Sequence, residues 1–261
     1  MSAGSLLRLY GHFLGLVQAF AQGHAKGILL KGVFIPSPQA KTLSKAQHFN
    51  EPSTPIITRF PSSTGNPDIP DSDPRSNHRG LAIRFQLAET PRRLHTDIID
   101  GIPGSNGEEA LEFFTALKNG TITEYIKGHP KAAHFFVAAS GEETFARYRI
   151  EPVLGVQELS AEEAAAKGSN YLYDGVVEMM GKGPVQFKLT VQIAEEGDVT
   201  DDPFVKWPGT RQVMELGTIS LVDVLNGNAA QQKYIIFDPI PRIDSLKHPM
   251  TSCFSTEREH I

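Results

Sequence analysis

The sequence contains a single cysteine, Cys253, among its 261 residues. One thiol cannot close a disulfide within the chain or supply a cluster of thiolates to a metal, so disulfide-built secreted scaffolds and thiolate zinc sites are excluded. We therefore expect a reducing, intracellular and cytoplasmic setting. No secretory leader is expected in the interrupted apolar stretch 6–20, and the terminal Glu259-His260-Ile261 is not a peroxisomal address of the Ser-Lys-Leu type.

Basic charge and long apolar runs are also scarce. The chain has 25 lysines and arginines against 30 aspartates and glutamates, a net charge of −5. Proteins that bind nucleic acid usually carry a basic face, so no nucleic-acid partner is expected. No apolar run approaches the ~18 residues needed to cross a bilayer, so no membrane partner is expected. Glycine-rich phosphate loops, zinc spacings and nucleophile elbows are absent as well.

What the chain does have is enough apolar material for one core, since 40% of its residues are hydrophobic. We expect one domain at residues 23–240, preceded by a helical arm at 1–22 and followed by a tail at 241–261. The acidic pairs Glu195-Glu196 and Asp201-Asp202 are interpreted as solvated loop residues rather than metal ligands.

Strict alternation of apolar and polar residues predicts strands at 81–87 and 185–193, each with one buried face. Ser160 followed three residues later by Glu163 predicts a helix N-terminus with a capping box. Further strands are predicted at 28–35, 145–150, 213–221 and 233–237, and helices at 5–21, 108–118, 121–128 and 160–180. The predicted fold class is α+β: an antiparallel β-barrel with helical insertions, in a single domain.

One histidine stands out by its context. His24 lies between the first predicted helix and the first predicted strand, and it directly follows Gly23. A glycine there removes side-chain bulk, which would let a flat cofactor approach. A lone histidine is more often a structural group than a catalyst, but an imidazole with a pKa near neutrality also suits proton transfer.

The chain resembles the small catalase-related haem peroxidases of the catalase superfamily. The resemblance runs from about residue 23 to residue 239, and its blocks occur in the family's order. These blocks are His-Ala-Lys-Gly at 24–27, Thr-Arg-Phe at 58–60, the loop 65–74, Arg-Gly-Leu-Ala-Ile-Arg-Phe at 79–85, Thr-Asp-Ile at 96–98, Gly-Pro-Val at 183–185, Asp-Asp-Pro at 201–203, Trp-Pro at 207–208, Glu-Leu-Gly-Thr at 215–218 and Phe-Asp-Pro at 237–239.

This resemblance implies a catalase-like barrel, haem b as the cofactor, and hydrogen peroxide or an organic peroxide as the small-molecule partner. It implies that His24 is the catalytic acid–base group and that Arg59 pairs with a haem propionate. It also implies that the strand carrying Phe85 lines the barrel near the haem, with Gly23 beside the cofactor.

The sequence departs from the family pattern at several places, and two of the departures concern the catalytic site directly. The family's iron ligand is a tyrosine four residues after an arginine, and no arginine in this chain has one. The metal ligand is therefore unknown; Met250, Cys253, His248 and His260 each have a side chain able to bind iron. Asp100 stands at the place of the family's distal asparagine, and an ionised carboxylate accepts hydrogen bonds but donates none.

These departures keep an alternative open. The chain would then be a degenerate protein of the catalase fold that does not turn over peroxide, either a truncated product or a binding module for an apolar ligand in the barrel. The missing tyrosine favours this alternative, whereas the many matched blocks favour the enzyme.

Overall fold

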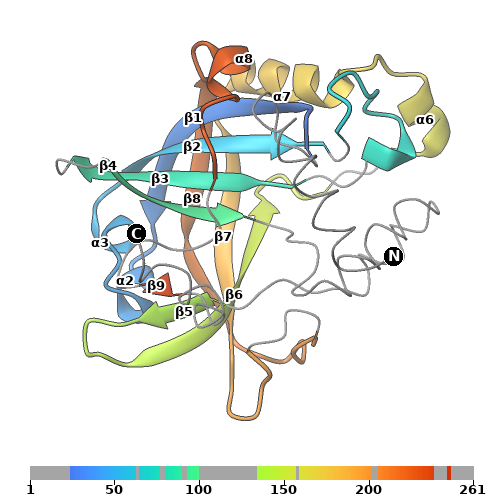
Figure 1. Cartoon of the computed structure of the whole chain (residues 1–261). Coiled ribbons are helices and arrows are strands. Elements are labelled where there is room, and N and C mark those ends of the chain that lie inside the picture. The colour runs from blue at the N-terminus through green and yellow to red at the C-terminus, as the bar shows by residue number, and fades with distance from the viewer. Residues whose placement is uncertain are drawn as a thin grey trace, which may run out of the picture.

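The strands of this protein together form one antiparallel sheet. The computed structural model describes residues 24–62, 65–76, 80–89, 93–99, 134–156, 159–200, 205–237 and 246–247. Within them, nine strands pair in the order β4-β3-β2-β1-β8-β7-β6-β5-β9. Their bounds are β1 (Gly27–Pro36), β2 (Thr54–Pro61), β3 (Ala82–Glu89), β4 (Arg93–Ile99), β5 (His134–Val137), β6 (Glu143–Pro152), β7 (Val185–Ile193), β8 (Val213–Val224) and β9 (Leu246–Lys247). The sheet curls strongly, as Figure 1 shows, and the predicted catalase-like fold class is confirmed.

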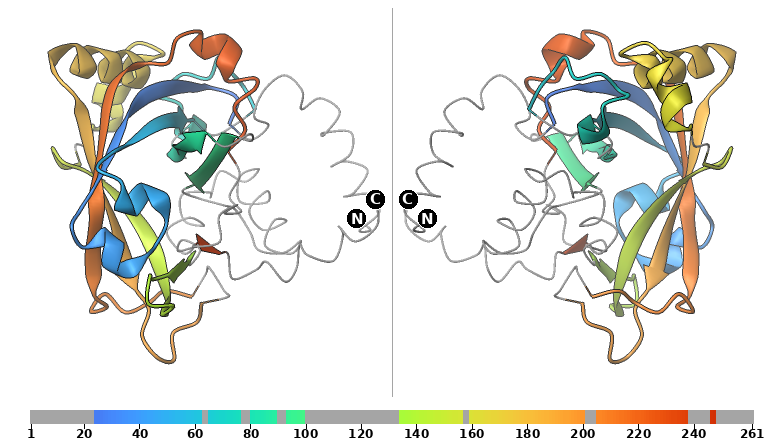
Figure 2. Two further views of the ribbon diagram at one scale, coloured as in Figure 1. Left: turned by 90° about the vertical axis from the view of Figure 1, so that its left-hand side faces the viewer. Right: turned by 90° about the vertical axis from the view of Figure 1, so that its right-hand side faces the viewer.

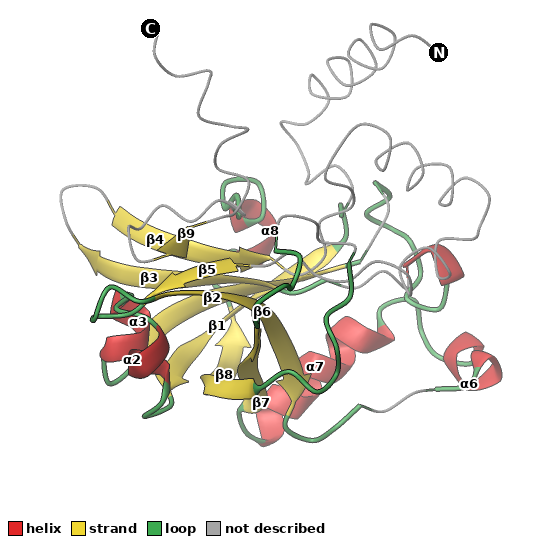
Figure 3. Cartoon of the chain, turned by 90° about the horizontal axis from the view of Figure 1, so that it is seen from below, coloured by secondary structure: helices red, strands yellow, loops and turns green. Residues whose placement is uncertain are grey.

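The inner face of the curled sheet carries the hydrophobic core. Its largest side chains include Phe34, Phe49, Phe85 and Phe136, none more than 2% exposed. The rings of Phe34 and Phe85 meet edge to face with their centroids 5.2 Å apart. Two short helices, α2 (Ala40–Leu43) and α3 (Gln47–Asn50), bring Phe49 to this core from one end of the sheet (Figure 3). Each buried phenylalanine contributes roughly 1.5–3 kcal/mol relative to an exposed one.

Strand β7 has the predicted bounds, but its two faces differ along its length. Gln186 and Lys188 are exposed, as the alternation predicts, whereas Thr190 and Gln192 are only 8% and 4% exposed. The segment 205–212 covers this second half, because the Gln192 side chain donates to the Pro208 carbonyl at 2.9 Å. A polar residue of an alternating strand is therefore buried here with its hydrogen bond satisfied.

The remaining helices lie outside the sheet. They are η1 (Pro74–Ser76), α6 (Ala161–Ala165), α7 (Tyr171–Lys182) and α8 (Asn228–Gln231). The capping box of Ser160 and Glu163 is confirmed, with both reciprocal hydrogen bonds present. Helix α7 packs against β7 and β8, and Figure 2 shows α7 and α8 near one end of the sheet with α2 and α3 below them.

The helix predicted at 160–180 is interrupted between α6 and α7. Gly168 lies in this gap, and glycine costs about 1 kcal/mol in a helix interior. The carbonyl of Ser169 accepts a hydrogen bond from Lys26 instead of continuing the helix. The interruption therefore serves a tertiary contact with the start of β1.

The predicted strand at 233–237 is wrong. After β8 the chain forms α8 and a turn at 232–234, and residues 235–237 belong to no strand. Because β8 already pairs with β1 on one side and β7 on the other, the returning chain finds no open edge beside it. Tyr234 and Ile236 are each 77% exposed, so the apolar side chains of this run do not reach the core.

Several expectations lie outside the described residues: the helices at 5–21, 108–118 and 121–128, and the arm at 1–22. Of the tail at 241–261, only 246–247 is described, and it pairs with β5 as strand β9. Among the described residues, no helix combines the length and the apolar character needed to cross a bilayer.

Candidate functional site

His24 lies immediately before β1, where antiparallel pairing brings it beside the end of β2. Its Nδ1 atom is 3.2 Å from the backbone carbonyl oxygen of Ser62. A carbonyl only accepts hydrogen bonds, so Nδ1 carries the proton of this contact. Burial lowers the pKa of His24; the bond to Ser62 opposes this, and the charge of Arg59 adds to it. The imidazole is therefore neutral at pH 7, protonated at Nδ1, and able to accept a proton at Nε2.

Arg59 is the second predicted residue that the structure places at this site. It lies on β2 with only 7% of its surface exposed. Its Nη2 donates to the backbone carbonyl of His24 at 2.6 Å, and its Nε donates to the Gln232 side-chain oxygen at 3.2 Å. Gln232 in turn donates to the carbonyl of Gly27 at 2.9 Å. Arg59 thus ties the turn at His24 to the segment that follows α8.

The charge of Arg59 has no carboxylate partner among the described residues. Within the described residues, its side chain donates to a carbonyl and an amide oxygen, both neutral. Burial lowers its pKa, and the nearby Tyr173 counteracts this, but a guanidinium stays protonated in proteins. Burying a charge without a counterion is unfavourable, so this environment is suited to an anionic group.

Gly27 leaves the space that this guanidinium occupies. A Cβ atom at Gly27 would lie 2.9 Å from Arg59 Nη2 and 3.0 Å from its Cζ. Any larger residue at this position would displace the Arg59 guanidinium from its hydrogen bonds. The glycine that ends the His-Ala-Lys-Gly block is thus explained by close approach of an arginine.

A buried ion pair fixes the segment around His24. Lys26 Nζ is 2.8 Å from Asp71 Oδ1, and it also donates to the carbonyls of Ile69 and Ser169. Asp71 uses its other oxygen to accept from the backbone N–H of Leu172 at 2.9 Å. The pair therefore connects the start of β1, the loop after β2 and the start of α7.

Phe85, the other described cofactor candidate, does not join this site. Arg59 pairs with Ala82 and Ile56 pairs with Phe85, three positions along the strand. Since successive side chains of a strand point to opposite faces, Phe85 and Arg59 lie on opposite faces of the sheet. The Phe85 ring contacts Phe34 and His48 in the core. Gly23 and Asp100 lie outside the described residues, so their predicted roles stay predictions.

Sequence reasoning missed the supporting residues Lys26, Asp71, Gln232 and Tyr173. Lys26 and Asp71 both stand in blocks that carry the family resemblance, which was the only signal available. Tyr173 hydrogen-bonds the Ser62 hydroxyl at 2.7 Å across 111 positions of sequence, and no local pattern predicts such a contact.

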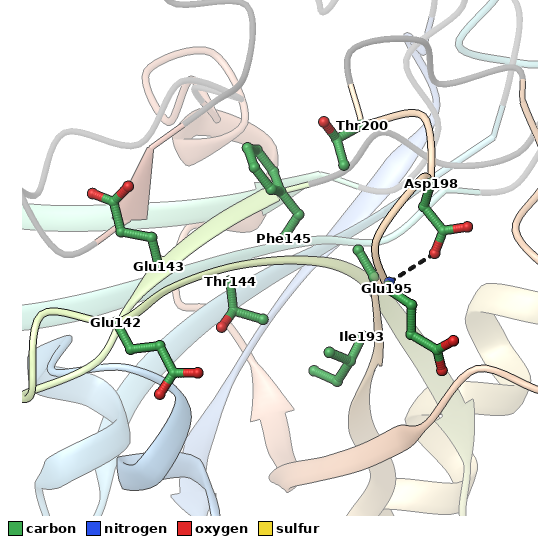
Figure 4. A pocket seen from close by; sticks show the side chains of 9 residues that line it. Glu142, Glu143, Thr144, Phe145, Ile193, Glu195, Asp198 and Thr200 are labelled. Carbon is green, nitrogen blue, oxygen red and sulfur yellow. Dashed lines mark hydrogen bonds between the residues drawn. The ribbon is translucent and has the colours of Figure 1, made fainter.

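A separate hollow of about 480 Å³ lies at the opposite end of the strands, between the start of β6 and the end of β7. It is lined by Glu142, Glu143, Thr144, Phe145, Ile193, Ala194, Glu195, Asp198 and Thr200 (Figure 4). Glu195 and Asp198 both form ion pairs with Arg211. No cluster of three or more possible metal-binding side chains occurs in the part of the chain that the structure describes. The side chains that line the hollow include no histidine and no arginine, so the hollow does not contain the kinds of group found around His24.

Known proteins resemble this chain both in sequence and in fold. No model of a protein family matches the sequence. The chain is 28% identical over 259 residues to a catalase-related peroxidase of Mycolicibacterium paratuberculosis, covering 86% of this chain and 81% of that protein. It is 24% identical over 261 residues to a catalase-related peroxidase of Synechococcus elongatus, covering 87% and 76%.

Solved structures of catalases resemble the chain in fold. A fungal catalase superposes with a TM-score of 0.70 at 17% identity, covering 94% of this chain and 58% of that one. Catalase A from Saccharomyces cerevisiae superposes with a TM-score of 0.70 at 17% identity, covering 95% and 61%. The protein thus has a catalase fold and spans about three fifths of the length of these enzymes. The chain is therefore similar in sequence to catalase-related peroxidases over most of its length, and it has the fold of the catalases.

Proposed function

We propose that this protein is a haem-dependent peroxidase that reduces or decomposes hydrogen peroxide or an organic peroxide. The observation that carries the proposal is the geometry at one end of the sheet. There, a neutral imidazole held at Nδ1 lies next to a buried guanidinium whose described acceptors are all neutral. The distant relatives named above support the same function. The single cysteine supports a cytoplasmic setting.

The described residues fit one side of a haem site. A guanidinium grips a carboxylate with two hydrogen bonds, so Arg59 would hold a propionate and satisfy its own buried charge. Haem b supplies an iron centre that exchanges electrons with peroxide when it is bound. Gly27 keeps the Arg59 guanidinium in place for this contact, because any Cβ at Gly27 would push it aside.

His24 would move the proton. With Nδ1–H donated to the Ser62 carbonyl, Nε2 is the free acceptor and takes the proton from one peroxide oxygen. The imidazolium would then return this proton to the other peroxide oxygen, so that this oxygen could leave as water or an alcohol. The haem held by Arg59 would supply the two-electron redox chemistry that breaking the O–O bond requires. Burial keeps the imidazole neutral beforehand, which is the state that accepts a proton.

The test is an absorption spectrum of the full chain, expressed with ample haem and then desalted, together with a peroxide assay. We expect a stoichiometric Soret band that shifts on adding peroxide. His24→Ala should abolish turnover and leave the haem content unchanged, whereas Arg59→Met should lower the haem content itself. His48→Leu is the matched control, because it also removes a histidine but lies in the core. Full turnover in His24→Ala would contradict the proposed role.

A second candidate function follows from the missing iron ligand. No arginine of the sequence is followed by a tyrosine four positions later, so the chain would be a catalase-fold protein without peroxide chemistry. Loss of all haem on desalting would favour this candidate. A ligand inside the barrel is less compatible with the structure, because Phe34, Phe49, Phe85 and Phe136 fill the core.

A further inference from the structure

We infer that Tyr173 is a positioning residue, which acts through Ser62 to hold the His24 imidazole in its Nδ1–H tautomer. The inference rests on the proposed function in one respect, because it assigns Tyr173 to the same proton-transfer site. Tyr173 lies in the first turn of α7, far in sequence from both residues on which it acts.

Tyr173 contacts Ser62 through a hydrogen bond between their side-chain hydroxyl groups. The two hydroxyl oxygens are 2.7 Å apart, the usual distance for a hydrogen bond between two hydroxyl groups. Ser62 is completely buried, so water does not compete for its hydroxyl. The backbone N–H of Ser62 also donates to the Lys26 carbonyl at 2.9 Å. With its side chain and its N–H both fixed, Ser62 has its carbonyl directed at His24 Nδ1.

The attachment of α7 to the loop after β2 sets the position of Tyr173. Asp71 donates its backbone N–H to the Ser169 carbonyl at 2.8 Å and accepts from the N–H of Leu172. The Lys26 ammonium binds both Asp71 and Ser169, and it lies 5.3 Å from the centre of the Tyr173 ring. A buried ion pair and several hydrogen bonds thus place the tyrosine hydroxyl above Ser62.

The position of the Ser62 carbonyl determines which ring nitrogen of His24 carries the proton. A neutral imidazole carries one ring proton, and only the tautomer protonated at Nδ1 leaves Nε2 able to accept a proton from a substrate. The Ser62 carbonyl selects this tautomer because it cannot donate. If Ser62 were free to rotate its peptide, the selection would weaken and part of the population would hold its proton on Nε2.

The experiment measures the His24 tautomer directly by two-bond ¹H–¹⁵N spectra of histidine-labelled full chain, purified without added haem. The His24 signals are identified by their loss in His24→Ala. Tyr173→Phe removes only the hydroxyl and keeps the ring beside Lys26. We expect it to lower the ratio of Nδ1–H to Nε2–H tautomer by roughly two- to tenfold, the range of one hydrogen bond.

The controls separate this contact from a general effect on α7. Tyr171→Phe makes the same chemical change in the same helical turn, and it should leave the His24 spectrum unchanged. Ser62→Ala keeps the carbonyl but removes the hydroxyl, so it should reproduce the shift. The double variant of Ser62 and Tyr173 should then add nothing to either single change. An unaltered His24 tautomer in Tyr173→Phe would overturn the inference.

Turnover distinguishes this inference from the function on which it rests. A tautomer shift in a protein that turns over no peroxide supports the positioning by Tyr173 and overturns the proposed function alone. If the wild-type protein turns over peroxide, Tyr173→Phe should lower kcat by roughly two- to tenfold at unchanged haem content. Unchanged kcat together with an unchanged tautomer overturns the inference and leaves the proposed function standing.

Discussion

His48 makes the stability of this protein sensitive to acid, and the size of the effect follows from its surroundings. The imidazole is completely buried against Phe49 and Phe85, with ring centroids 4.0 and 4.3 Å away. Neither of its nitrogens has a hydrogen-bond partner within the described part of the chain. Burial lowers its pKa from 6.5 to about 3, because no group offsets the loss of hydration of the charged form.

The direction in which the free energy of unfolding changes with pH follows from the number of protons that the folded and unfolded states bind. Between pH 6.5 and about 3 the unfolded chain binds a proton at His48 that the folded protein does not, so the free energy of unfolding falls as the pH falls. With these two pKa values, the His48 contribution falls by about 2 kcal/mol between pH 7 and pH 5. His24 acts in the same direction, since its pKa is also lowered by burial.

The perturbation is His48→Leu, which removes the titrating group and fills the site with an apolar side chain. Urea unfolding followed by circular dichroism at pH 7, 6 and 5 gives the free energy of unfolding for both proteins. Subtracting one curve from the other cancels His24 and isolates His48. We expect the wild type to lose about 2 kcal/mol more than the variant over this range. Parallel curves would refute the reasoning, because they would mean that folded His48 binds its proton as readily as the unfolded chain.

Two further changes probe the site's scaffold. Asp71→Asn leaves the buried Lys26 ammonium without its counterion and should lower the free energy of unfolding by about 3–5 kcal/mol, measured as a lower urea midpoint. Its control, Glu178→Gln in the exposed pair with Lys182, should leave the midpoint in place, and equal midpoints for both variants would contradict the expectation. Gly27→Ala should displace Arg59 and cost about 1 kcal/mol in the same assay, net of the small gain that alanine brings to a strand. A more stable Gly27→Ala protein would show that Arg59 moves aside without loss.

Sequence periodicity predicted the strands that have one buried and one solvated face. β7 begins and ends where its alternation does, and β3 differs from its prediction by one residue at its start and two at its end. β2 has no such signal, because its side chains are buried on both faces from Ile56 to Arg59. The strand prediction at 233–237 was wrong for the opposite reason. The composition of this segment favours a strand, but β8, the strand that precedes it in the chain, is already paired on both sides.

The site was predictable only where the family resemblance named a residue. His24 and Arg59 were both named, yet their contact depends on the register of β1 and β2, which pairs Leu29 with Arg59. Lys26 and Asp71 are 45 positions apart, so their ion pair follows from the path of the loop after β2. Long-range contacts of this kind are fixed by tertiary folding and have no local periodicity.

The sheet separates the two kinds of chemistry in this protein. The face that carries Phe85 packs against His48 of α3 and other aromatic rings, so substitutions there change the stability of the protein and its dependence on pH. The face that carries Arg59 meets Gln232 and the turn at His24, so its changes appear in ligand binding and in the state of the imidazole. A strand alternates between these faces at every residue, so the core face can preserve the fold, here at 17% identity to a fungal catalase, while residues on the other face change. The catalase fold is therefore weak evidence for activity. The tautomer and the protonation of the His24 imidazole are stronger evidence, because they belong to the site itself.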